Sequence, residues 1–184
     1  MAGTPFKGRG AVSRPEGRFE TRPVEFDDEE QYRRDASAPE TVLTAMRAGK
    51  IISHNTSPDV PFDRSINPYQ GCEHGCIYCY ARPSHSYLDL SPGLDFETRI
   101  FYKPNAAARL LETWGKTGYE CEPITIGANT DPYQPAEKSL QVTRQLLELF
   151  REHSHPVNII TKGNLILRDL DLLAELASRR LCSV

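Results

Sequence analysis

The second half of the chain alternates short apolar runs with longer segments of helical periodicity. Residues 123–129 and 157–162 are apolar and flanked by polar residues, as in buried strands, whereas residues 136–153 and 167–180 place apolar side chains three and four positions apart. Residues 181–184 follow the last helical segment directly and open like a further strand. Strands that alternate with helices predict an α/β fold with a parallel sheet built from βα units.

The first half of the chain has weaker patterns. Residues 38–49 carry apolar residues at helical spacing and stop at a glycine, so they predict a short helix. Residues 96–103 alternate as a strand does, and the segment after them predicts a helix capped by Asn105 and closed near Gly115 or Gly118.

The N-terminal stretch differs in composition from the rest. Residues 1–38 are rich in Gly, Pro, Arg, Asp and Glu, and such a stretch buries too little apolar surface to offset its ordering entropy. We therefore predict an extended or disordered arm over residues 1–38 and one core domain over residues 39–184. Because the chain stops where a buried strand begins, we expect this domain to be incomplete at its C-terminal end.

Composition narrows the class of protein. The chain is 39% hydrophobic and 26% charged, with a formal net charge of -3, which is typical of a soluble globular protein and gives no reason to expect a dedicated nucleic-acid or membrane binder. No apolar run approaches the roughly 18 residues of a membrane span, and the N-terminus lacks the apolar core of a secretory signal. We expect a cytoplasmic protein.

The cysteines are unevenly placed. Cys72, Cys76 and Cys79 lie within eight positions in a CxxxCxxC pattern, too close together to form a disulfide framework. In a reducing compartment this grouping predicts a metal site. Cys121 and Cys182 stand alone in the sequence, and an isolated cysteine usually behaves as a small buried hydrophobic residue.

Two kinds of metal site are compatible with three clustered thiols. A structural zinc takes four protein ligands, and His74 is the nearby candidate for a Cys3His set, although its place between Cys72 and Cys76 would strain a tetrahedral site. A 4Fe-4S cluster fits better, because three of its irons take cysteines and the fourth is left open. Gly71 and Gly75 allow the tight turns that such a loop needs.

Polar segments follow each predicted strand of the sheet. "GCEHGC" comes after the first strand, "NTDPYQPAE" after the second and "TKGN" after the third. Ligands of parallel α/β folds bind at the carboxyl ends of the strands, so these loops are the candidate site.

The cysteine stretch carries a family resemblance. "GCEHGCIYCY" resembles the CxxxCxΦC signature of radical S-adenosylmethionine enzymes, in which Φ is an aromatic residue, here Tyr78. The segments "KGRGAVSRPEGRFE", "GANTDPYQPAEK" and "ITKGNLILRDLDLL" are similar to the spore photoproduct lyase-like, or DNA repair photolyase-like, branch of this superfamily. The resemblance implies the N-terminal part of a partial (β/α)6 TIM-like barrel, the radical S-adenosylmethionine core.

The resemblance also implies a role for each residue of the cluster loop. Cys72, Cys76 and Cys79 would hold a 4Fe-4S cluster, whose remaining iron would bind the amino and carboxylate groups of S-adenosylmethionine. Tyr78 would lie against the adenine, and the alternative is a packing role. The rings of Tyr69, Tyr78 and Tyr80 would limit access of water to the site.

The later loops would complete the cofactor site. Asn129, Thr130 and Asp131 would face the methionine ammonium, and Lys162 would pair with the cofactor's carboxylate. Each has an ordinary alternative, because Asp131 before a proline is a common turn residue and Lys162 fits a solvated loop.

The resemblance implies reductive cleavage of S-adenosylmethionine to a 5′-deoxyadenosyl radical that abstracts hydrogen from a substrate. An electron donor such as flavodoxin or ferredoxin would be needed, and nucleic acid enters as a partner by analogy alone. Ala128 stands where spore photoproduct lyases carry a hydrogen-donating cysteine, which argues against thymine-dimer lyase activity. The alternatives are a small zinc-stabilised binding module with a Cys3His site and an inactive fragment of a radical S-adenosylmethionine enzyme. The sequence does not name the substrate.

Overall fold

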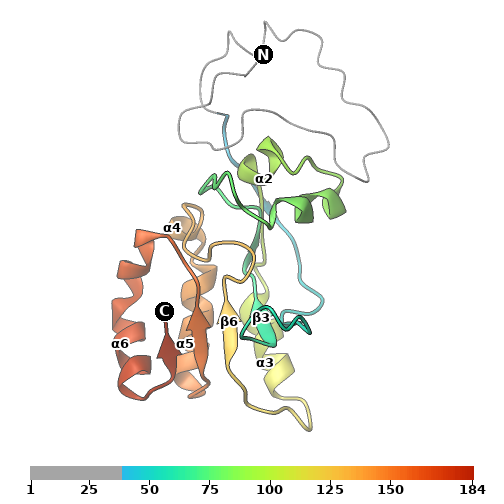
Figure 1. Cartoon of the computed structure of the whole chain (residues 1–184). Coiled ribbons are helices and arrows are strands. Elements are labelled where there is room, and N and C mark those ends of the chain that lie inside the picture. Colours follow the sequence, from blue (N-terminus) through green and yellow to red (C-terminus); the bar gives the residue numbers. More distant parts are fainter. Residues whose placement is uncertain (1–38) are drawn as a thin grey trace, which may run out of the picture. The chain divides into compact units, whose positions relative to one another are not determined.

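A computed structural model describes residues 39–184 of the chain (Figure 1), so the arm predicted over residues 1–38 lies outside the described residues. Within the described part, no helix combines the length and the apolar character that a membrane crossing requires.

The chain divides into two compact units. Among the described residues, the first comprises residues 39–44 together with Gln70–Phe101, and the second comprises Ala45–Tyr69 together with Tyr102–Val184. We call them the cysteine unit and the sheet unit, because the three clustered cysteines belong to the first and the parallel sheet belongs to the second.

Five short strands form the sheet of the sheet unit: β2 (Ser53–His54), β3 (Arg64–Ile66), β6 (Ile124–Ile126), β7 (Val157–Ile159) and β8 (Cys182–Ser183). Their order across the sheet is β2-β3-β6-β7-β8. β3, β6, β7 and β8 run parallel, and β2 pairs antiparallel with β3. The predicted α/β fold with a parallel sheet is confirmed.

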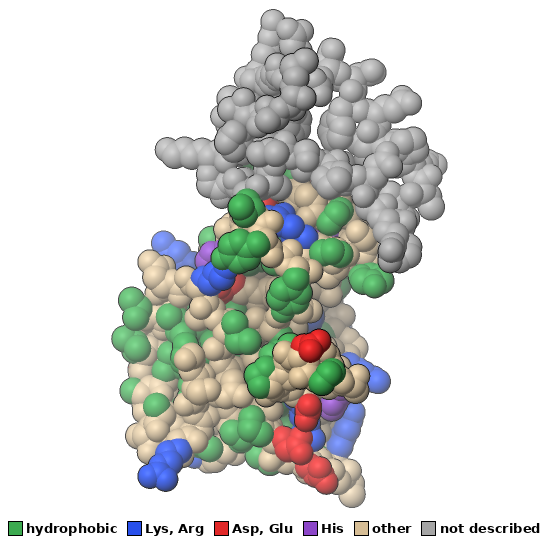
Figure 2. Space-filling model, viewed as in Figure 1, with side chains coloured by type: hydrophobic (Ala, Val, Ile, Leu, Met, Phe, Trp, Pro, Cys, Tyr) green, Lys and Arg blue, Asp and Glu red, His purple; other side chains and the backbone are tan. Residues whose placement is uncertain are grey.

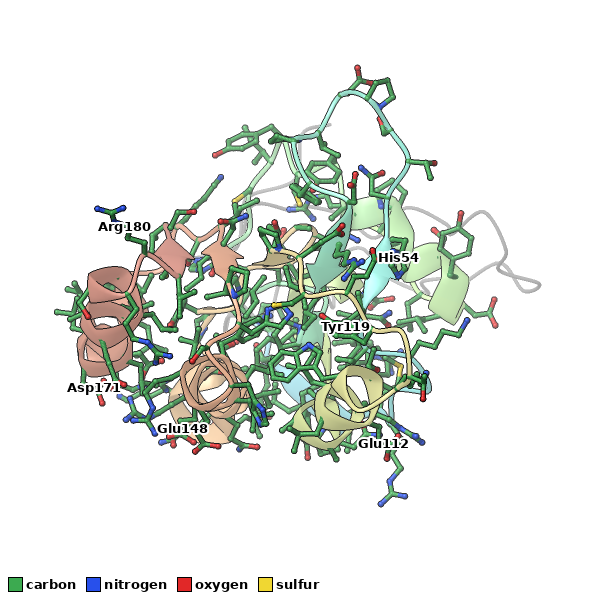
Figure 3. All side chains as sticks on the ribbon, turned by 90° about the horizontal axis from the view of Figure 1, so that it is seen from below. His54, Glu112, Tyr119, Glu148, Asp171 and Arg180 are labelled. Atoms are coloured by element: carbon green, nitrogen blue, oxygen red, sulfur yellow. The ribbon has the colours of Figure 1, made fainter. Side chains whose placement is uncertain are left out.

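The helices that pack on this sheet share one side of it. They are α3 (Ala106–Trp114), α5 (Val142–Glu152) and α6 (Leu170–Ser178). Figure 3 shows all three on the same side of the strands, with Glu112, Glu148 and Asp171 marking them in turn. Leu110, Leu146 and other large apolar side chains of these helices are fully buried. Each such leucine contributes about 2 kcal/mol relative to an exposed one.

The two faces of the sheet differ in chemistry. One residue from each parallel strand lies opposite the next in register, and together they form what we call the polar row: Ser65, Thr125, Asn158 and Ser183. Residues paired in register point to the same face, and the neighbours Ile126 and Ile159 point to the other. The sheet therefore offers an apolar face to its helices and a hydrogen-bonding face on the opposite side.

The cysteine unit is smaller. Strands β1 (Val42–Ala45), β5 (Arg99–Tyr102) and β4 (Tyr69–Gln70) form a second sheet in the order β1-β5-β4, and the division between the units falls within these strands. The unit also contains a 3-10 helix, η1 (Arg82–Leu88), and the short helix α2 (Leu94–Thr98).

The predicted helix over residues 38–49 is wrong. The segment contains strand β1 instead, and its apolar residues Val42 and Leu43 are exposed while Ala48 is buried. A helix would have needed a partner for an apolar face, whereas pairing with β5 satisfies the backbone, and the amide of Met46 donates to the carbonyl of Tyr102 at 2.8 Å.

The predicted strand over residues 96–103 is right only in its second half. β5 begins at Arg99, and the preceding residues form α2, all five of whose residues are buried. The carboxylate of Asp95 accepts from the amide of Ser91 at 2.9 Å, and the hydroxyl of Thr98 donates to the carbonyl of Leu94 at 2.9 Å. These local bonds support a turn of helix where the alternation predicted a strand.

The remaining helices lie close to their predicted ranges. Asn105 precedes α3 as predicted, but its side chain exchanges hydrogen bonds with the backbone of Ala48 rather than capping the helix. The helix predicted over residues 136–153 is divided into α4 (Glu137–Leu140) and α5, because Gln141 has a φ of 52°. The helix predicted over residues 167–180 starts inside a 3-10 turn, η2 (Asn164–Asp169), and continues as α6.

Candidate functional site

The three clustered cysteines lie in one loop of the cysteine unit. Cys72 is 8% exposed and packs with Ala81 and Phe96, and Cys79 packs against this small cluster. Cys76 is half-buried. The loop follows β4, a strand of the smaller sheet, and not the first strand of the parallel sheet as the sequence predicted.

The thiols share a loop without converging on one point. Among residues 39–184, no three side chains of His, Cys, Asp or Glu are gathered closely enough to hold a metal ion. The donor set itself fits a 4Fe-4S cluster, because Cys72, Cys76 and Cys79 belong to one short loop and Gly75 has a φ of 62°. Binding would require the loop to bring the three thiols closer together.

The start of the loop is fixed by close packing. The amide of Cys72 donates to the carbonyl of Phe96 at 2.8 Å. Gly71 has a φ of +81°, and a Cβ atom there would lie 2.9 Å from both His85 and Ile100. Glycine is therefore required at position 71, and it sets the position of the first cysteine.

Arg82 fixes the middle of the loop, and the sequence analysis did not identify it. Its guanidinium donates to the carbonyl of Cys76 through Nε and Nη2, at 3.2 and 2.9 Å, and to the carbonyl of Gly93 at 3.2 Å. It also forms an ion pair with the buried carboxylate of Glu97 at 2.5 Å and lies over the ring of Phe96. An arginine six residues after Cys76 was the one available signal.

The aromatic residues of the loop have different environments. Tyr78 and Tyr80 are 75% and 74% exposed, so their rings are open to a ligand. Tyr69 belongs to the sheet unit, where it is fully buried and its hydroxyl bonds the carboxylate of Glu137. Tyr69 therefore has a packing role, and the predicted shielding by Tyr78 and Tyr80 stays a prediction.

The carboxyl edge of the parallel sheet gathers the loops after β3, β6 and β7. Asn67 follows β3, and its Oδ1 atom accepts from the amide of Asn129 at 2.8 Å. Lys103 donates from Nζ to the carbonyl of Asn67 at 2.7 Å. Burial lowers the pKa of Lys103 below its ordinary value. Asn67 and Lys103 are additional polar residues of this edge.

Asp131 connects two of these loops. Its Oδ1 atom accepts from the amide of Tyr133 at 2.8 Å and from the hydroxyl of Thr161 at 2.6 Å, while Oδ2 accepts from the amide of Lys162 at 2.7 Å. The hydroxyl of Thr130 is buried and donates to the carbonyl of Tyr69 at 2.7 Å. Asp131 and Thr130 thus hold the edge in shape, whereas the side chains of Asn129 and Lys162 are exposed.

Two glycines allow these loops to approach closely. Gly127 has a φ of +91°, and a Cβ atom there would lie 2.3 Å from the carbonyl oxygen of Ile160. A Cβ atom at Gly163 would lie 2.5 Å from the carbonyl oxygen of Tyr133. Any larger residue at either position would push the edge loops apart.

A buried ionic network lies beneath the loop after β6, and the sequence analysis missed it. Glu137 accepts from the amide of Thr143 at 2.9 Å and from Arg168 at 2.8 Å, and Arg168 and Arg144 both donate to Asp169. Burial alone would raise the pKa of Asp169, but its hydrogen bonds with Arg168 and Arg144 hold that pKa below the ordinary value. The partners lie up to 31 residues apart, so no local pattern indicates them.

The two isolated cysteines differ from each other. Cys121 is exposed, so the expectation that it is a buried hydrophobic residue is wrong. It lies in the connection between α3 and β6, where burial is not available. Cys182 in β8 is half-buried, and burial raises the pKa of its thiol.

Comparisons with known proteins found relatives in two genera. The uncharacterized proteins Rv2578c of Mycobacterium tuberculosis and Mb2609c of Mycobacterium bovis are each 42% identical over 120 residues, which is 65% of this chain and 35% of the relative. The uncharacterized protein MJ0683 of Methanocaldococcus jannaschii is 29% identical over 136 residues, which is 74% of this chain and 48% of the relative. No family model and no solved structure matches the sequence. The chain spans about a third to about half of the length of these relatives.

Proposed function

We propose that this chain is part of a radical S-adenosylmethionine enzyme of the spore photoproduct lyase-like branch. The observation that carries the proposal is the loop of Cys72, Cys76 and Cys79, which offers three thiols in one short segment and an exposed ring at Tyr78. Three thiols leave one iron of a 4Fe-4S cluster without a protein ligand. An incomplete ligand set suits a cluster that must bind a second cofactor.

The bound cluster would supply an electron for reductive cleavage of S-adenosylmethionine, whose 5′-deoxyadenosyl fragment then takes a hydrogen atom from the substrate. The chain's own residues bind, orient and exclude water. The side chain of Cys72 is buried against Ala81 and Phe96. Arg82 donates a hydrogen bond to the carbonyl of Cys76 and so fixes that part of the loop. Tyr78 offers an exposed face on which an adenine can stack.

The resemblance implies cofactor-binding roles for polar residues at the carboxyl edge of the sheet. Asp131 and Asn129 present acceptors suited to a methionine ammonium, and the exposed Lys162 suits a carboxylate. Asp131 also orients Lys162 through its backbone amide, so one carboxylate positions both parts of the edge. Thr130 supports this arrangement from beneath.

A partial (β/α)6 barrel is the proposed architecture of the complete domain. In a barrel the helices cover one side of the parallel strands, whereas a doubly wound sheet has helices on both sides. The position of α3, α5 and α6 on one side of the sheet favours the barrel. The polar row lies on the opposite face. Thr125 of this row has a buried hydroxyl without a hydrogen-bond partner among the described residues.

The partners follow from the proposed chemistry. The enzyme would work in the cytoplasm with an electron donor such as flavodoxin or ferredoxin. Nucleic acid is proposed as a partner by analogy with the branch alone. On the described part of the face in Figure 2, cationic and acidic side chains are mixed, so this face has no continuous basic surface for a nucleic acid. Ala128 leaves the loop after β6 without a hydrogen-donating thiol, so a reaction other than thymine-dimer cleavage is favoured.

The test is anaerobic purification of the chain with reconstitution of iron and sulfide. We expect close to four irons per chain, a brown protein, and formation of 5′-deoxyadenosine when dithionite and S-adenosylmethionine are added. Cys72→Ser, Cys76→Ser and Cys79→Ser should each lose the cluster. Cys121→Ser is the matched control and should keep it, because this cysteine is exposed and lies in the sheet unit.

Two other outcomes would change the assignment. A colourless protein that retains one zinc per chain, and loses it in His74→Ala, would establish the zinc-stabilised binding module instead. A protein that binds the cluster but cleaves no S-adenosylmethionine would be an inactive fragment if a form extended to the length of the curated relatives is active.

A further inference from the structure

Lys103 is a half-buried cation at the carboxyl edge of the sheet, in a position that the family resemblance does not assign. It follows β5 directly, and its backbone amide donates to the carbonyl of Pro68 at 3.1 Å. Its Nζ atom donates to the carbonyl of Asn67 at 2.7 Å. No carboxylate among the described residues forms an ion pair with it.

The surroundings of Lys103 are unfavourable for an ammonium group on its own. Burial disfavours the charged form, which is why the pKa of Lys103 is lowered, and one carbonyl satisfies one of three N–H donors. A neutral donor would serve equally well if the role were to bond Asn67. A charged donor at this position is stabilised when a negative group binds at the edge of the sheet.

A second donor lies on the same edge. The amide of Asn129 bonds the side chain of Asn67, the residue whose carbonyl accepts from Lys103, so the three residues form one connected group. The side chain of Asn129 is exposed and forms no hydrogen bond with a described residue. Its amide group is therefore available to donate to a ligand at this edge.

We propose that Lys103 and Asn129 form an oxyanion-binding subsite at the carboxyl edge of the parallel sheet. The ligand group is a carboxylate or a phosphate, because both offer oxygen acceptors to an ammonium and an amide donor. Its source is an anionic group of the substrate or the carboxylate of S-adenosylmethionine, which in that case would bind here in place of its proposed pairing with Lys162. The subsite depends on residues of the sheet unit and not on the iron cluster.

The direct test follows the Lys103 resonance by NMR in the full chain, with lysines labelled with carbon-13 at the ε position. Inorganic phosphate should shift this resonance in a saturable way and raise the pKa of Lys103, because an anion stabilises the charged amine. Lys138 is exposed on α4 and serves as the internal control, whose resonance should follow ionic strength alone. Sodium chloride at matched ionic strength separates screening from binding.

Variants provide the second measurement. Lys103→Met keeps the length of the side chain and removes the charge, and it should weaken phosphate binding at least tenfold, measured by phosphate-dependent thermal stabilisation. Lys138→Met should leave that stabilisation unchanged. Asn129→Ala should weaken binding several-fold. If Lys103→Met does not fold, the NMR titration of the unmodified chain decides alone.

Two further probes distinguish the possible sources of the oxyanion. A response to S-adenosylmethionine that is absent with its decarboxylated analogue identifies the cofactor's carboxylate, and a response to phosphate but not to S-adenosylmethionine identifies the substrate's group. If none of the anions moves the Lys103 resonance, or if Lys103→Met retains full phosphate stabilisation, the subsite does not exist. An iron-free protein can pass this test, so its outcome is independent of the cluster assay.

Discussion

Replacing Arg82 by methionine tests how the cysteine loop is held. The substitution removes three hydrogen bonds to the carbonyls of Cys76 and Gly93, together with the ion pair between Arg82 and the buried carboxylate of Glu97. Breaking a buried ion pair on one side costs about 3–5 kcal/mol. The side chain of Arg82 keeps 14% exposure, so we expect the lower end of this range, about 3 kcal/mol.

Hydrogen exchange followed by mass spectrometry is the suitable assay, because it separates the two units of one chain. Peptides within residues 70–101 should lose protection by roughly a hundredfold, which corresponds to about 3 kcal/mol. Peptides from β6 and β7 should keep theirs, since no contact of Arg82 involves these strands. Iron retention by the reconstituted protein should fall as well, because the carbonyl of Cys76 loses its anchor.

Arg99→Met is the matched control, because this arginine is exposed and lies in the same unit. We expect a change below about 0.5 kcal/mol. A loss of less than about 1 kcal/mol in Arg82→Met, or an equal loss of protection in both variants, would contradict this prediction. In either case the pair with Glu97 would not be what holds the loop.

Three further predictions concern the sheet unit. Burial, together with the charges of nearby cations, lowers the pKa of His155 below its ordinary 6.5, so the unfolded chain takes up a proton that the folded chain excludes. Stability should therefore fall as the pH drops below about 6.5, as followed by urea denaturation with Trp114 fluorescence, and His155→Gln should flatten this dependence. Gly127→Ala should cost about 2 kcal/mol or more in the same assay, whereas Gly49→Ala, with open space around its Cα, should be nearly neutral. Glu137→Gln should cost about 3 kcal/mol, because it disrupts a buried ion pair with an arginine.

Each of these has an outcome that contradicts it. A pH dependence that persists unchanged in His155→Gln would assign it to another group. Equal effects of Gly127→Ala and Gly49→Ala would mean that the edge loops are not closely packed. An unchanged free energy of unfolding in Glu137→Gln would show that the buried network does not stabilise the fold.

The sequence by itself determined the parts of this protein that depend on short-range patterns. Apolar runs and helical periodicity lie within single segments, so β6, β7, β8, α3 and α6 were predicted close to their observed ranges, and α5 was predicted as the second part of one longer helix. The same holds for the cysteine loop, because the spacing of Cys72, Cys76 and Cys79 is a property of eight consecutive positions. The polar loops after β6 and β7 followed from knowing where those strands end.

Tertiary structure alone decided what depends on a partner distant in the chain. Residues 42–45 form a strand because β5 offers backbone groups to pair with, and the division between α4 and α5 coincides with the positive φ of Gln141. Arg82 meets Glu97, and Arg168 meets Glu137, across 15 and 31 residues of chain. The position of Lys103 beside Asn67 is of the same kind, since the two residues are 36 positions apart. Long-range contacts of this type carry no periodic signal, because any residue able to reach the partner can make them.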